Sequence, residues 1–317
     1  MIQVLITGGA GFIGSNIARE LTEQEYTVKI LDNLSTGNLN NISDIKNKIE
    51  LIIGDVRDIK IVKKVMKDVD YVFHQAALPS VPRSIQDPIT TNKINVNGTL
   101  NILIAAQDNN VKKVVYASSS SVYGNTPTLP KREDMEPCPL SPYAITKLIG
   151  EYYCKVFYDI YGLETVSLRY FNVFGPRQDP NSQYAAVIPK FITSMLKNES
   201  PTIFGDGEQS RDFTFVKDVV QANILACKAK NASGEVFNIA YGKKTSINEL
   251  VDKINEILGT SIKAKHTDPR LGDVRHSLAD ISKAKRILGY KPKYDIEEGL
   301  KETIEYMRRK KDESKRK

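Results

Sequence analysis

Short runs of apolar residues, mostly β-branched and aliphatic, recur through the first half of the chain and predict buried strands. They lie at residues 3–7, 27–31, 49–53, 69–74 and 111–118. Helix-length segments with apolar residues at helical spacing separate these runs, as at 96–108. Because strands that alternate with helices build βαβ units, the pattern predicts an α/β fold, a Rossmann-type doubly wound parallel sheet.

The second half of the chain has a different pattern. A long amphipathic helix is predicted from Pro142 toward Ile160, with Ser141 as its N-cap. Beyond it, glycine and proline become frequent, and the strands become fewer and shorter. Three further helical segments are predicted at 216–230, 247–258 and 296–308. This change predicts a smaller C-terminal α/β lobe packed on the first domain.

Composition and charge narrow the class of protein. The net charge is +7, but the last ten residues hold seven basic and two acidic side chains, so the rest of the chain is barely basic. We therefore expect no nucleic-acid partner. The chain has no secretory signal and no apolar stretch long enough to span a membrane. Its three cysteines lack metal-ligand spacing, so we expect a cytoplasmic protein without a metal site.

Glycines follow the first predicted strand in the sequence TGGAGFIG. Gly8, Gly11 and Gly14 have the spacing that permits a tight turn and the close approach of a pyrophosphate to a helix N-terminus. Asp32 ends the second strand, where a carboxylate accepts hydrogen bonds from ribose hydroxyls and repels a 2′-phosphate, so NAD is favoured over NADP. Asp55, after the third strand, is either an adenine ligand or a helix N-cap.

A second group of residues predicts acid–base chemistry. Tyr143 and Lys147 lie one helical turn apart in YAITK, and Ser118 to Ser121 follow the fifth strand, at the ligand-binding edge of such a sheet. A free tyrosine titrates near 10. A nearby ammonium and a cationic nicotinamide would both lower that pKa, so Tyr143 could remove a hydroxyl proton while hydride leaves the same carbon.

These residues occur together, in this order, in the extended short-chain dehydrogenase/reductase family, which the chain resembles from about residue 1 to residue 305. Within that family it is most similar to the nucleotide-sugar 4-epimerases. The similar segments include HQAALPSVPRS, ASSSSVYG, SPYAITK, RYFNVFGPRQDP, AAVIPKF, GDGEQSRDFTFV and RLGDVRHSLADISKA.

The resemblance implies roles for individual residues. The catalytic residues would be Ser119, Tyr143 and Lys147. The residues expected to bind NAD are Gly8, Gly11, Phe12, Ile13, Gly14, Asp32, Asn33, Asp55, Val56, Gln75, Ala76, Ala77, Pro79, Tyr143, Lys147 and Tyr170. The residues expected to bind a UDP-sugar are Ser80, Ser119, Ser120, Tyr143, Asn172, Val187, Phe204, Arg211, Arg270, Asp273 and Ser277. Two of these, Arg211 and Arg270, suit the neutralisation of a diphosphate.

The resemblance also implies a division of the chain. Residues 1–170 would form the NAD-binding domain with the catalytic residues, and 171–307 would mainly bind the substrate. Residues 308–317 would be a basic, disordered tail. A homodimer is expected, formed through the helices near 96–108 and 143–160. The implied reaction oxidises C4 of the sugar to a ketone and returns the hydride to the opposite face.

Related activities remain as alternatives. The family's 4,6-dehydratases and UDP-glucuronate decarboxylases carry an acidic residue just before VYG, where this chain has Ser121. UDP-glucuronate 4-epimerases share SSSSVYG but usually have threonine at the position of Asn172. A non-catalytic NAD-binding regulator would typically lose the tyrosine or the lysine, and both are present here.

The size of the sugar is expected to depend on Ser277. In this family a bulky aromatic at the matching position goes with enzymes limited to glucose and galactose, and a small residue goes with tolerance of a 2-acetamido group. Serine leaves space that a tyrosine ring would fill. The sequence therefore predicts epimerisation of UDP-GlcNAc and UDP-GalNAc, with UDP-Glc and UDP-Gal also accepted. An enzyme restricted to non-acetylated sugars is the alternative.

Overall fold

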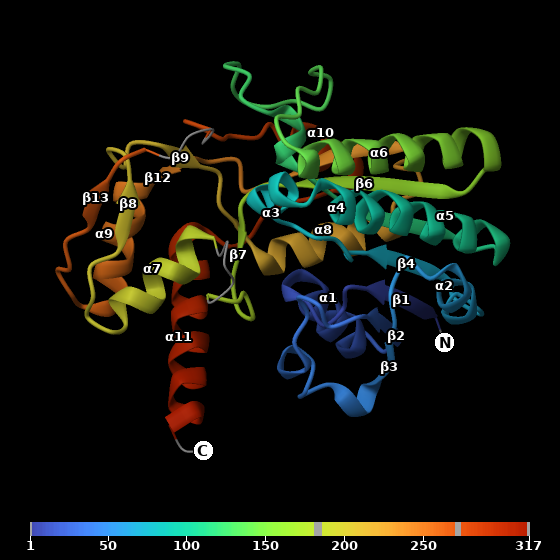
Figure 1. Ribbon diagram of the computed structural model, residues 1–317, viewed down its shortest axis with the longest axis horizontal. Coiled ribbons are helices and arrows are strands. Elements are labelled where there is room, and N and C mark those ends of the chain that lie inside the picture. Colours follow the sequence, from blue (N-terminus) through green and yellow to red (C-terminus); the bar gives the residue numbers. More distant parts are fainter. Residues whose placement is uncertain (1, 181–185, 270–273, 316–317) are drawn as a thin grey trace.

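A seven-stranded parallel sheet forms the centre of the protein, seen here in a computed structural model that describes residues 2–180, 186–269 and 274–315 (Figure 1). Its spatial order is β11-β6-β5-β4-β1-β2-β3. The strands are β1 (Gln3–Thr7), β2 (Thr27–Asp32), β3 (Ile49–Ile53), β4 (Tyr71–His74), β5 (Lys113–Ser119), β6 (Glu164–Tyr170) and β11 (Glu235–Ile239). The predicted Rossmann-type α/β fold is confirmed.

Helices cover both faces of this sheet, which explains why the strands are apolar on both sides. On one face, α2 (Ile59–Val65), α5 (Gly98–Asp108) and α6 (Pro142–Tyr161) share a core with Leu5 and Val72. On the other face, α1 (Phe12–Glu23), α8 (Val216–Lys228) and α10 (Ser282–Leu288) pack against strand residues such as Ile6.

The helix α6 begins where the sequence predicts. The Ser141 side chain caps it by accepting a hydrogen bond from the Ala144 amide at 3.1 Å, and Pro142 occupies its first turn. Gly162 ends it in the left-handed conformation, with φ of 71°. The predicted helix over 96–108 is α5, preceded by α3 (Val81–Gln86), α4 (Pro88–Asn92) and a π-helical turn, η3 (Lys93–Asn97). The 3₁₀ turns are η1 (Leu39–Asn41), η2 (Lys46–Lys48) and η4 (Ser120–Tyr123).

The smaller lobe has its own apolar core. Phe174 and Phe215 contact each other with ring centroids 5.5 Å apart, and Phe215 also contacts Tyr294. The helices of this lobe are α7 (Val187–Met195), α9 (Ile247–Leu258) and α11 (Ile296–Lys315). Its short strands form the pairs β7 (Val173–Phe174) with β10 (Thr214–Phe215), β8 (Thr202–Phe204) with β13 (Lys265–Thr267), and β9 (Ser210–Arg211) with β12 (Thr245–Ser246).

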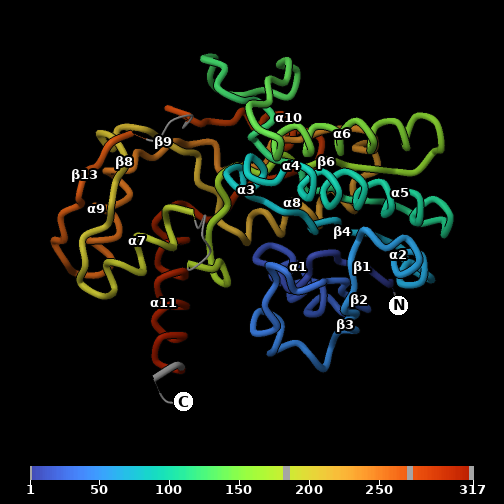
Figure 2. Tube along the Cα trace, in the orientation of Figure 1, coloured from blue at the N-terminus to red at the C-terminus, as the bar shows by residue number. Residues whose placement is uncertain are grey.

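The lobes are not divided at residue 170 as expected. The chain passes into the smaller lobe after β6 and then returns, so that α8 packs on the large sheet and β11 pairs with β6 (Figure 2). Without β11, β6 would be an edge strand with unpaired backbone N–H and C=O groups, and β11 pairs with them. Segment 216–240 is therefore part of the large-sheet domain in space.

The expected disordered tail also differs from the structure. The helix α11 continues to Lys315. Lys310 pairs with Glu313, and the Lys311 ammonium donates to the Leu196 carbonyl at 3.2 Å, so the basic segment has helical and tertiary partners over its first residues. Across the described ranges, none of the helices has the length and apolar character needed to cross a membrane.

Candidate active site

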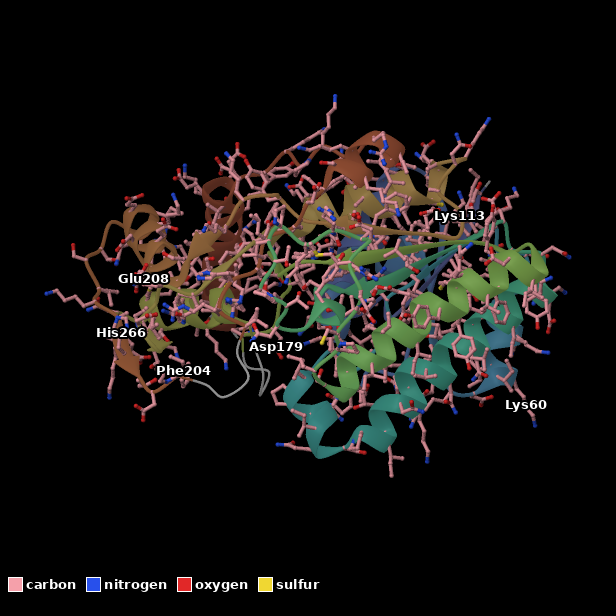
Figure 3. The ribbon with its side chains drawn as sticks, turned by 90° about the horizontal axis from the view of Figure 1, so that it is seen from above. Lys60, Lys113, Asp179, Phe204, Glu208 and His266 are labelled. Carbon is pink, nitrogen blue, oxygen red and sulfur yellow. The ribbon has the colours of Figure 1, made fainter. Side chains whose placement is uncertain are left out.

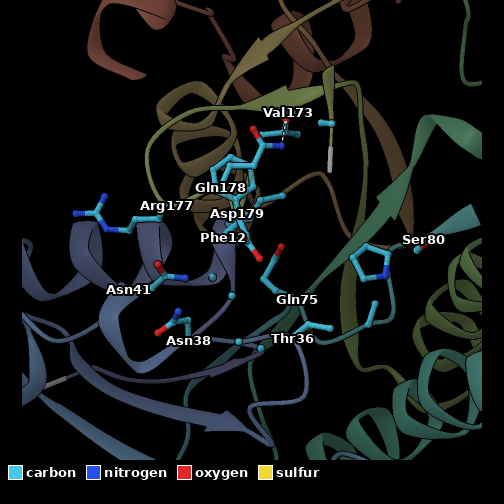
Figure 4. A pocket seen from close by; sticks show the side chains of 18 of the residues that line it. Phe12, Thr36, Asn38, Asn41, Gln75, Ser80, Val173, Arg177, Gln178 and Asp179 are labelled. Carbon is cyan, nitrogen blue, oxygen red and sulfur yellow. Dashed lines mark hydrogen bonds between the residues drawn. The ribbon is translucent and has the colours of Figure 1, made fainter. Parts of the chain in front are cut away.

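A cavity of about 1540 Å³ opens at the carboxyl ends of β1, β2, β4 and β5, between the large sheet and the smaller lobe. The strand order reverses between β1 and β4, because β2 and β3 extend to one side of β1 and the later strands to the other. Ligands bind at such switch points in doubly wound sheets. Figure 4 shows wall residues that come from both lobes.

The glycine turn forms one end of the cavity. Gly8 has φ of +68°, and a Cβ at this position would lie 2.8 Å from the Ala76 nitrogen. A Cβ at Gly14 would lie 2.3 Å from the Gly8 carbonyl oxygen, so only glycine allows α1 to pack this closely on the turn. Gly11 caps α1 without a side-chain hydrogen bond, which leaves first-turn amides available to an anion.

Asp32 lies beside this turn on the cavity wall. Its carboxylate is 7 % exposed and accepts the Ala10 amide at 2.9 Å and the Leu34 amide at 2.8 Å. These two hydrogen bonds hold the carboxylate and leave further lone pairs for ribose hydroxyls. The following residues, 33–41, contain no lysine or arginine that could pair with a 2′-phosphate. This arrangement suits NAD.

The Asp55 carboxylate pairs with two neighbouring side chains. Its carboxylate accepts Arg57 Nη2 at 2.7 Å and Asn33 Nδ2 at 2.8 Å, and the Arg57 hydrogen bond lowers the pKa of Asp55 to about 2. The cavity wall includes the neighbouring Val56 but not Asp55. The role of Asp55 as an adenine ligand stays a prediction, since a carboxylate with these partners keeps further lone pairs.

The catalytic candidates converge where α6 meets the end of β5. Tyr143 and Lys147 share one face of α6, and the Ser119 hydroxyl acts on the Tyr143 phenol by lowering its pKa. The backbone amide of Tyr143 donates to Ser84 Oγ at 3.0 Å, which fixes the start of the helix against α3. All three predicted catalytic residues, Ser119, Tyr143 and Lys147, line the cavity.

Burial sets the protonation of this group. The Lys147 ammonium donates to the Ala117 carbonyl at 2.7 Å and lies 5.9 Å from the centroid of the Tyr143 ring. Burial lowers the pKa of Lys147 to about 8. Burial also raises the pKa of Tyr143, and the Ser119 hydrogen bond offsets this only in part. In the protein alone, desolvation of the phenolate has the larger effect on the pKa of Tyr143, and the lowering expected from the ammonium together with a bound nicotinamide stays a prediction.

Polar side chains cross the floor of the cavity toward α8. The Tyr170 hydroxyl donates to Asn223 Oδ1 at 2.9 Å, and Gln75 Nε2 donates to the Tyr170 oxygen at 3.1 Å. Burial raises the pKa of Tyr170, so this tyrosine remains a neutral hydrogen-bonding group. Asn223 belongs to the part of the chain that returns from the smaller lobe, which explains why the sequence pattern did not reveal it.

The smaller lobe brings only some of its predicted residues to the cavity. Asn172 lines the wall, and its Nδ2 donates to the Asp212 carbonyl at 3.2 Å and to Ser277 Oγ at 3.4 Å. Arg211 Nη1 donates to the carbonyl of Ser210 at 3.0 Å. Figure 3 shows Phe204 in the smaller lobe, whereas Lys113 marks the amino end of β5. The wall does not include Val187, Phe204, Arg211 or Ser277. Arg270 and Asp273 lie outside the described residues.

The other predicted residues are on the wall. With Asp55 as the exception, these cofactor candidates line the cavity: Gly8, Gly11, Phe12, Ile13, Gly14, Asp32, Asn33, Val56, Gln75, Ala76, Ala77, Pro79, Tyr143, Lys147 and Tyr170. The substrate candidates there are Ser80, Ser119, Ser120, Tyr143 and Asn172.

The structure adds wall residues that the sequence pattern did not assign. They include Thr36, Asn38 and Asn41 after β2, and Arg177, Gln178 and Asp179 after β7 (Figure 4). Arg177 Nη1 donates to Asn16 Oδ1 at 3.1 Å, and its guanidinium lies 5.4 Å from the centroid of the Tyr306 ring. The segment FGPRQDP could have indicated them, because polar residues in a loop beyond a strand often contact ligands.

Known proteins share this architecture along nearly the whole chain. A model of the NAD dependent epimerase/dehydratase family matches residues 4–240. The UDP-N-acetylglucosamine 4-epimerase of Methanobrevibacter ruminantium, solved with UDP-N-acetylmuramic acid, is 47% identical with a TM-score of 0.94, covering 98% of this chain and 99% of that chain.

Two further solved enzymes bind different sugars. The Thermotoga maritima UDP-glucose 4-epimerase, solved with UDP-glucose, is 40% identical with a TM-score of 0.93, covering 98% of this chain and 99% of that one. The Bacillus cereus UDP-glucuronic acid 4-epimerase, solved with UDP-glucuronic acid and NAD, is 33% identical with a TM-score of 0.90, covering 97% and 99%. The protein belongs to the NAD dependent epimerase/dehydratase family.

Proposed function

We propose that this protein is a UDP-sugar 4-epimerase that interconverts UDP-GlcNAc and UDP-GalNAc and also accepts UDP-Glc and UDP-Gal. One observation carries the proposal. Tyr143, Ser119 and Lys147 line the same cavity as the glycine turn and Asp32. An acid–base group and a dinucleotide cradle in one cavity suit reversible oxidation of an alcohol.

The cradle fits NAD. The turn from Gly8 to Gly14 would hold the pyrophosphate at the start of α1, and Asp32 would hold the adenosine ribose. When bound, NAD supplies a hydride acceptor and a positive charge that favours the Tyr143 phenolate. The protein itself orients the reacting alcohol and excludes water from around it.

Tyr143 is the proposed acid and base. Its phenolate accepts the proton of the sugar C4 hydroxyl and later returns a proton to the C4 oxygen. The Ser119 hydroxyl, which lines the cavity with Tyr143, would stabilise the reacting oxygen. The Lys147 ammonium stabilises the phenolate electrostatically, so the rate should fall as the pH rises through the Lys147 pKa of about 8.

The side chain at 121 favours epimerisation over elimination or decarboxylation. Ser121 lines the cavity, and its buried Oγ has no hydrogen-bond partner among the described residues. A hydroxyl here is a far weaker proton donor than the carboxyl that the related lyases carry at this position. The 4-keto sugar would therefore be reduced again rather than dehydrated.

Ser277 is the proposed gate for the size of the sugar. Its Oγ lies 3.4 Å from Nδ2 of Asn172, which is on the wall, so a larger side chain at 277 would extend toward the cavity. We expect Ser277→Tyr to reduce turnover of UDP-GlcNAc by roughly 10- to 100-fold more than turnover of UDP-Glc. Ser277→Ala is the control, because it removes the hydroxyl without filling space. Equal losses on both sugars in Ser277→Tyr would contradict the gate.

The function itself is tested with the purified protein and three substrates, UDP-GlcNAc, UDP-Glc and UDP-glucuronic acid. Each reaction is analysed for the C4 epimer by chromatography or NMR. The proposal expects the highest kcat/KM with UDP-GlcNAc. Conversion of UDP-Glc alone would favour the restricted epimerase, and conversion of UDP-glucuronic acid alone would favour the enzyme type solved from Bacillus cereus.

We also propose that two copies associate through α6. Several apolar side chains on this helix are solvent-exposed, among them Tyr152 at 58 %, Val156 at 42 % and Ile160 at 70 %. Val156→Asp should convert the wild-type dimer to monomer in sedimentation velocity, because a charge in an apolar interface is poorly solvated. Ile2→Asp, an exposed apolar position far from α6 in the sequence, is the control. A wild-type monomer would overturn the proposal.

A further inference from the structure

A buried ion pair joins α6 to β6 one helical turn beyond Lys147. Arg169 in β6 donates to Glu151 in α6 from Nε at 2.9 Å and from Nη2 at 2.7 Å. Each residue is 3 % exposed, and the Arg169 guanidinium also lies 4.7 Å from the centroid of the Tyr123 ring. Ser118 in β5 completes the group by donating a hydrogen bond to the same carboxylate.

Ser118, Glu151 and Arg169 connect the three elements that carry the proposed site, which are β5, α6 and β6. Glu151 lies one turn beyond Lys147 on the same face of α6. Ser118 and Arg169 are paired in the β5–β6 ladder, and the next pair in register is Ser119 with Tyr170, both on the cavity wall. A shift in the ion pair would therefore move the catalytic serine, the catalytic lysine and a wall tyrosine together.

Stability alone does not account for the pair. Removing two charges from water costs about as much as their mutual attraction returns, so packed apolar residues often serve equally well. Apolar packing was available, since the α6 side of the sheet is otherwise built from residues such as Cys154 and Val114. The location of the pair, on the elements that carry Lys147, Ser119 and Tyr170, therefore points to a role other than stability.

Resting on the proposed function, we infer that Glu151 and Arg169 are positioning residues: the pair holds β5, β6 and α6 in register and keeps the Lys147 ammonium charged beside Tyr143. Neither residue touches the reacting atoms. Glu151 acts on Lys147 through its charge and on Ser119 through Ser118, and Arg169 fixes the direction of the Glu151 carboxylate.

The charged and titratable groups around Lys147 support this role. On α6 itself they are Tyr143 and Glu151. From β5, the Tyr116 ring lies 5.2 Å from the Lys147 ammonium, and burial raises the pKa of its phenol. From β4, His74 is buried between Thr7 and Thr99, and burial lowers its pKa to about 3, so this histidine is neutral.

Glu151 is thus the carboxylate that favours the charged lysine. Burial lowers the Lys147 pKa, and the charge of Glu151 raises it. Removing the Glu151 charge should therefore lower the pH at which Lys147 loses its proton.

The experiment measures that titration directly. We expect Glu151→Gln to lower the Lys147 titration midpoint by about one pH unit, because an adjacent opposite charge shifts a pKa by this order. The measurement is an NMR titration of the purified NAD-loaded protein with ¹³C-labelled lysine side chains, in which Lys147→Met identifies the Lys147 signal. In the epimerase assay, the basic limb of the kcat profile should move to lower pH by the same amount.

A second variant covers the case in which an unpaired Arg169 prevents folding. Glu151→Gln combined with Arg169→Met removes both charges, and its midpoint should lie between those of Glu151→Gln and the wild type. Asp159→Asn is the matched control, since it removes an exposed carboxylate from the same helix, where Asp159 pairs with Lys155. Its midpoint should equal that of the wild type.

The outcomes separate this inference from the proposed function. An unchanged Lys147 midpoint in whichever pair variant folds would overturn the inference, even if rate or stability falls, because the pair would then be only a scaffold. A shifted midpoint in a protein that epimerises none of the three UDP-sugars would leave the inference about Lys147 standing and overturn the proposed function.

Discussion

Tyr143→Phe should lower the epimerisation rate by about 10³-fold while the protein stays folded and keeps its NAD. The substitution removes only the phenolic oxygen, which is the atom proposed to exchange a proton with the sugar. The ring remains and preserves the packing of this partly buried position. The measurements are the rate with UDP-GlcNAc and UDP-Glc, and the NAD content of the purified variant determined after acid release.

Another tyrosine on the same helix provides the control. Tyr161 is the last residue of α6, is 54 % exposed and does not line the cavity. Tyr161→Phe should therefore leave the rate unchanged. A Tyr143→Phe enzyme that works within a few-fold of the wild type would refute the assignment of the base. Loss of NAD from that variant would show that Tyr143 mainly binds the cofactor.

Gly14→Ala is expected to abolish useful NAD binding, with a decrease in affinity of about 100-fold. The added Cβ would lie 2.3 Å from the Gly8 carbonyl oxygen and 2.9 Å from the Gly9 Cα. Both neighbours are backbone atoms of the turn itself, so the turn must move away from α1, and overpacking of this kind costs a few kcal/mol. Calorimetric titration of the NAD-depleted protein measures the affinity.

Substitutions at two other glycines serve as controls for the loss of NAD affinity. At Gly11 the nearest atom to an added Cβ is the Gly8 oxygen at 3.1 Å, so Gly11→Ala should weaken NAD binding far less. Gly162, with φ of +71° and open space around it, ends α6. Gly162→Ala should lower the melting temperature through backbone strain and leave NAD affinity intact. Equal NAD affinities for Gly14→Ala and Gly11→Ala would contradict the role assigned to the turn.

The glycine turn and Tyr143 both line the same cavity. The tight turn at Gly8 and Gly14 is the proposed binding site for the pyrophosphate. The chain between them and Tyr143 is long, so the two are brought together only by the order of strands in the sheet. Because burial disfavours the Tyr143 phenolate, little of this proposed base is ionised until an additional positive charge arrives in the cavity. This property links proton removal to an occupied nucleotide cradle.

The elements and motifs that depend on neighbouring residues could be predicted from the sequence. The strands from β1 to β5 follow from apolar runs, and the start of α6 follows from Ser141 and Pro142. The glycine turn and the shared helical face of Tyr143 and Lys147 follow from spacing alone. Each is local, because backbone conformation and side-chain direction repeat over a few residues.

The tertiary structure decided what depends on distant residues and on burial. It placed β11 beside β6, although residues 171–234 of the chain lie between them. It turned Asp55 toward Arg57, raised rather than lowered the Tyr143 pKa, and paired Glu151 with Arg169. Pairings between distant elements and the loss of water around a charged group arise only when the chain is packed. They therefore cannot be predicted from spacing along the sequence.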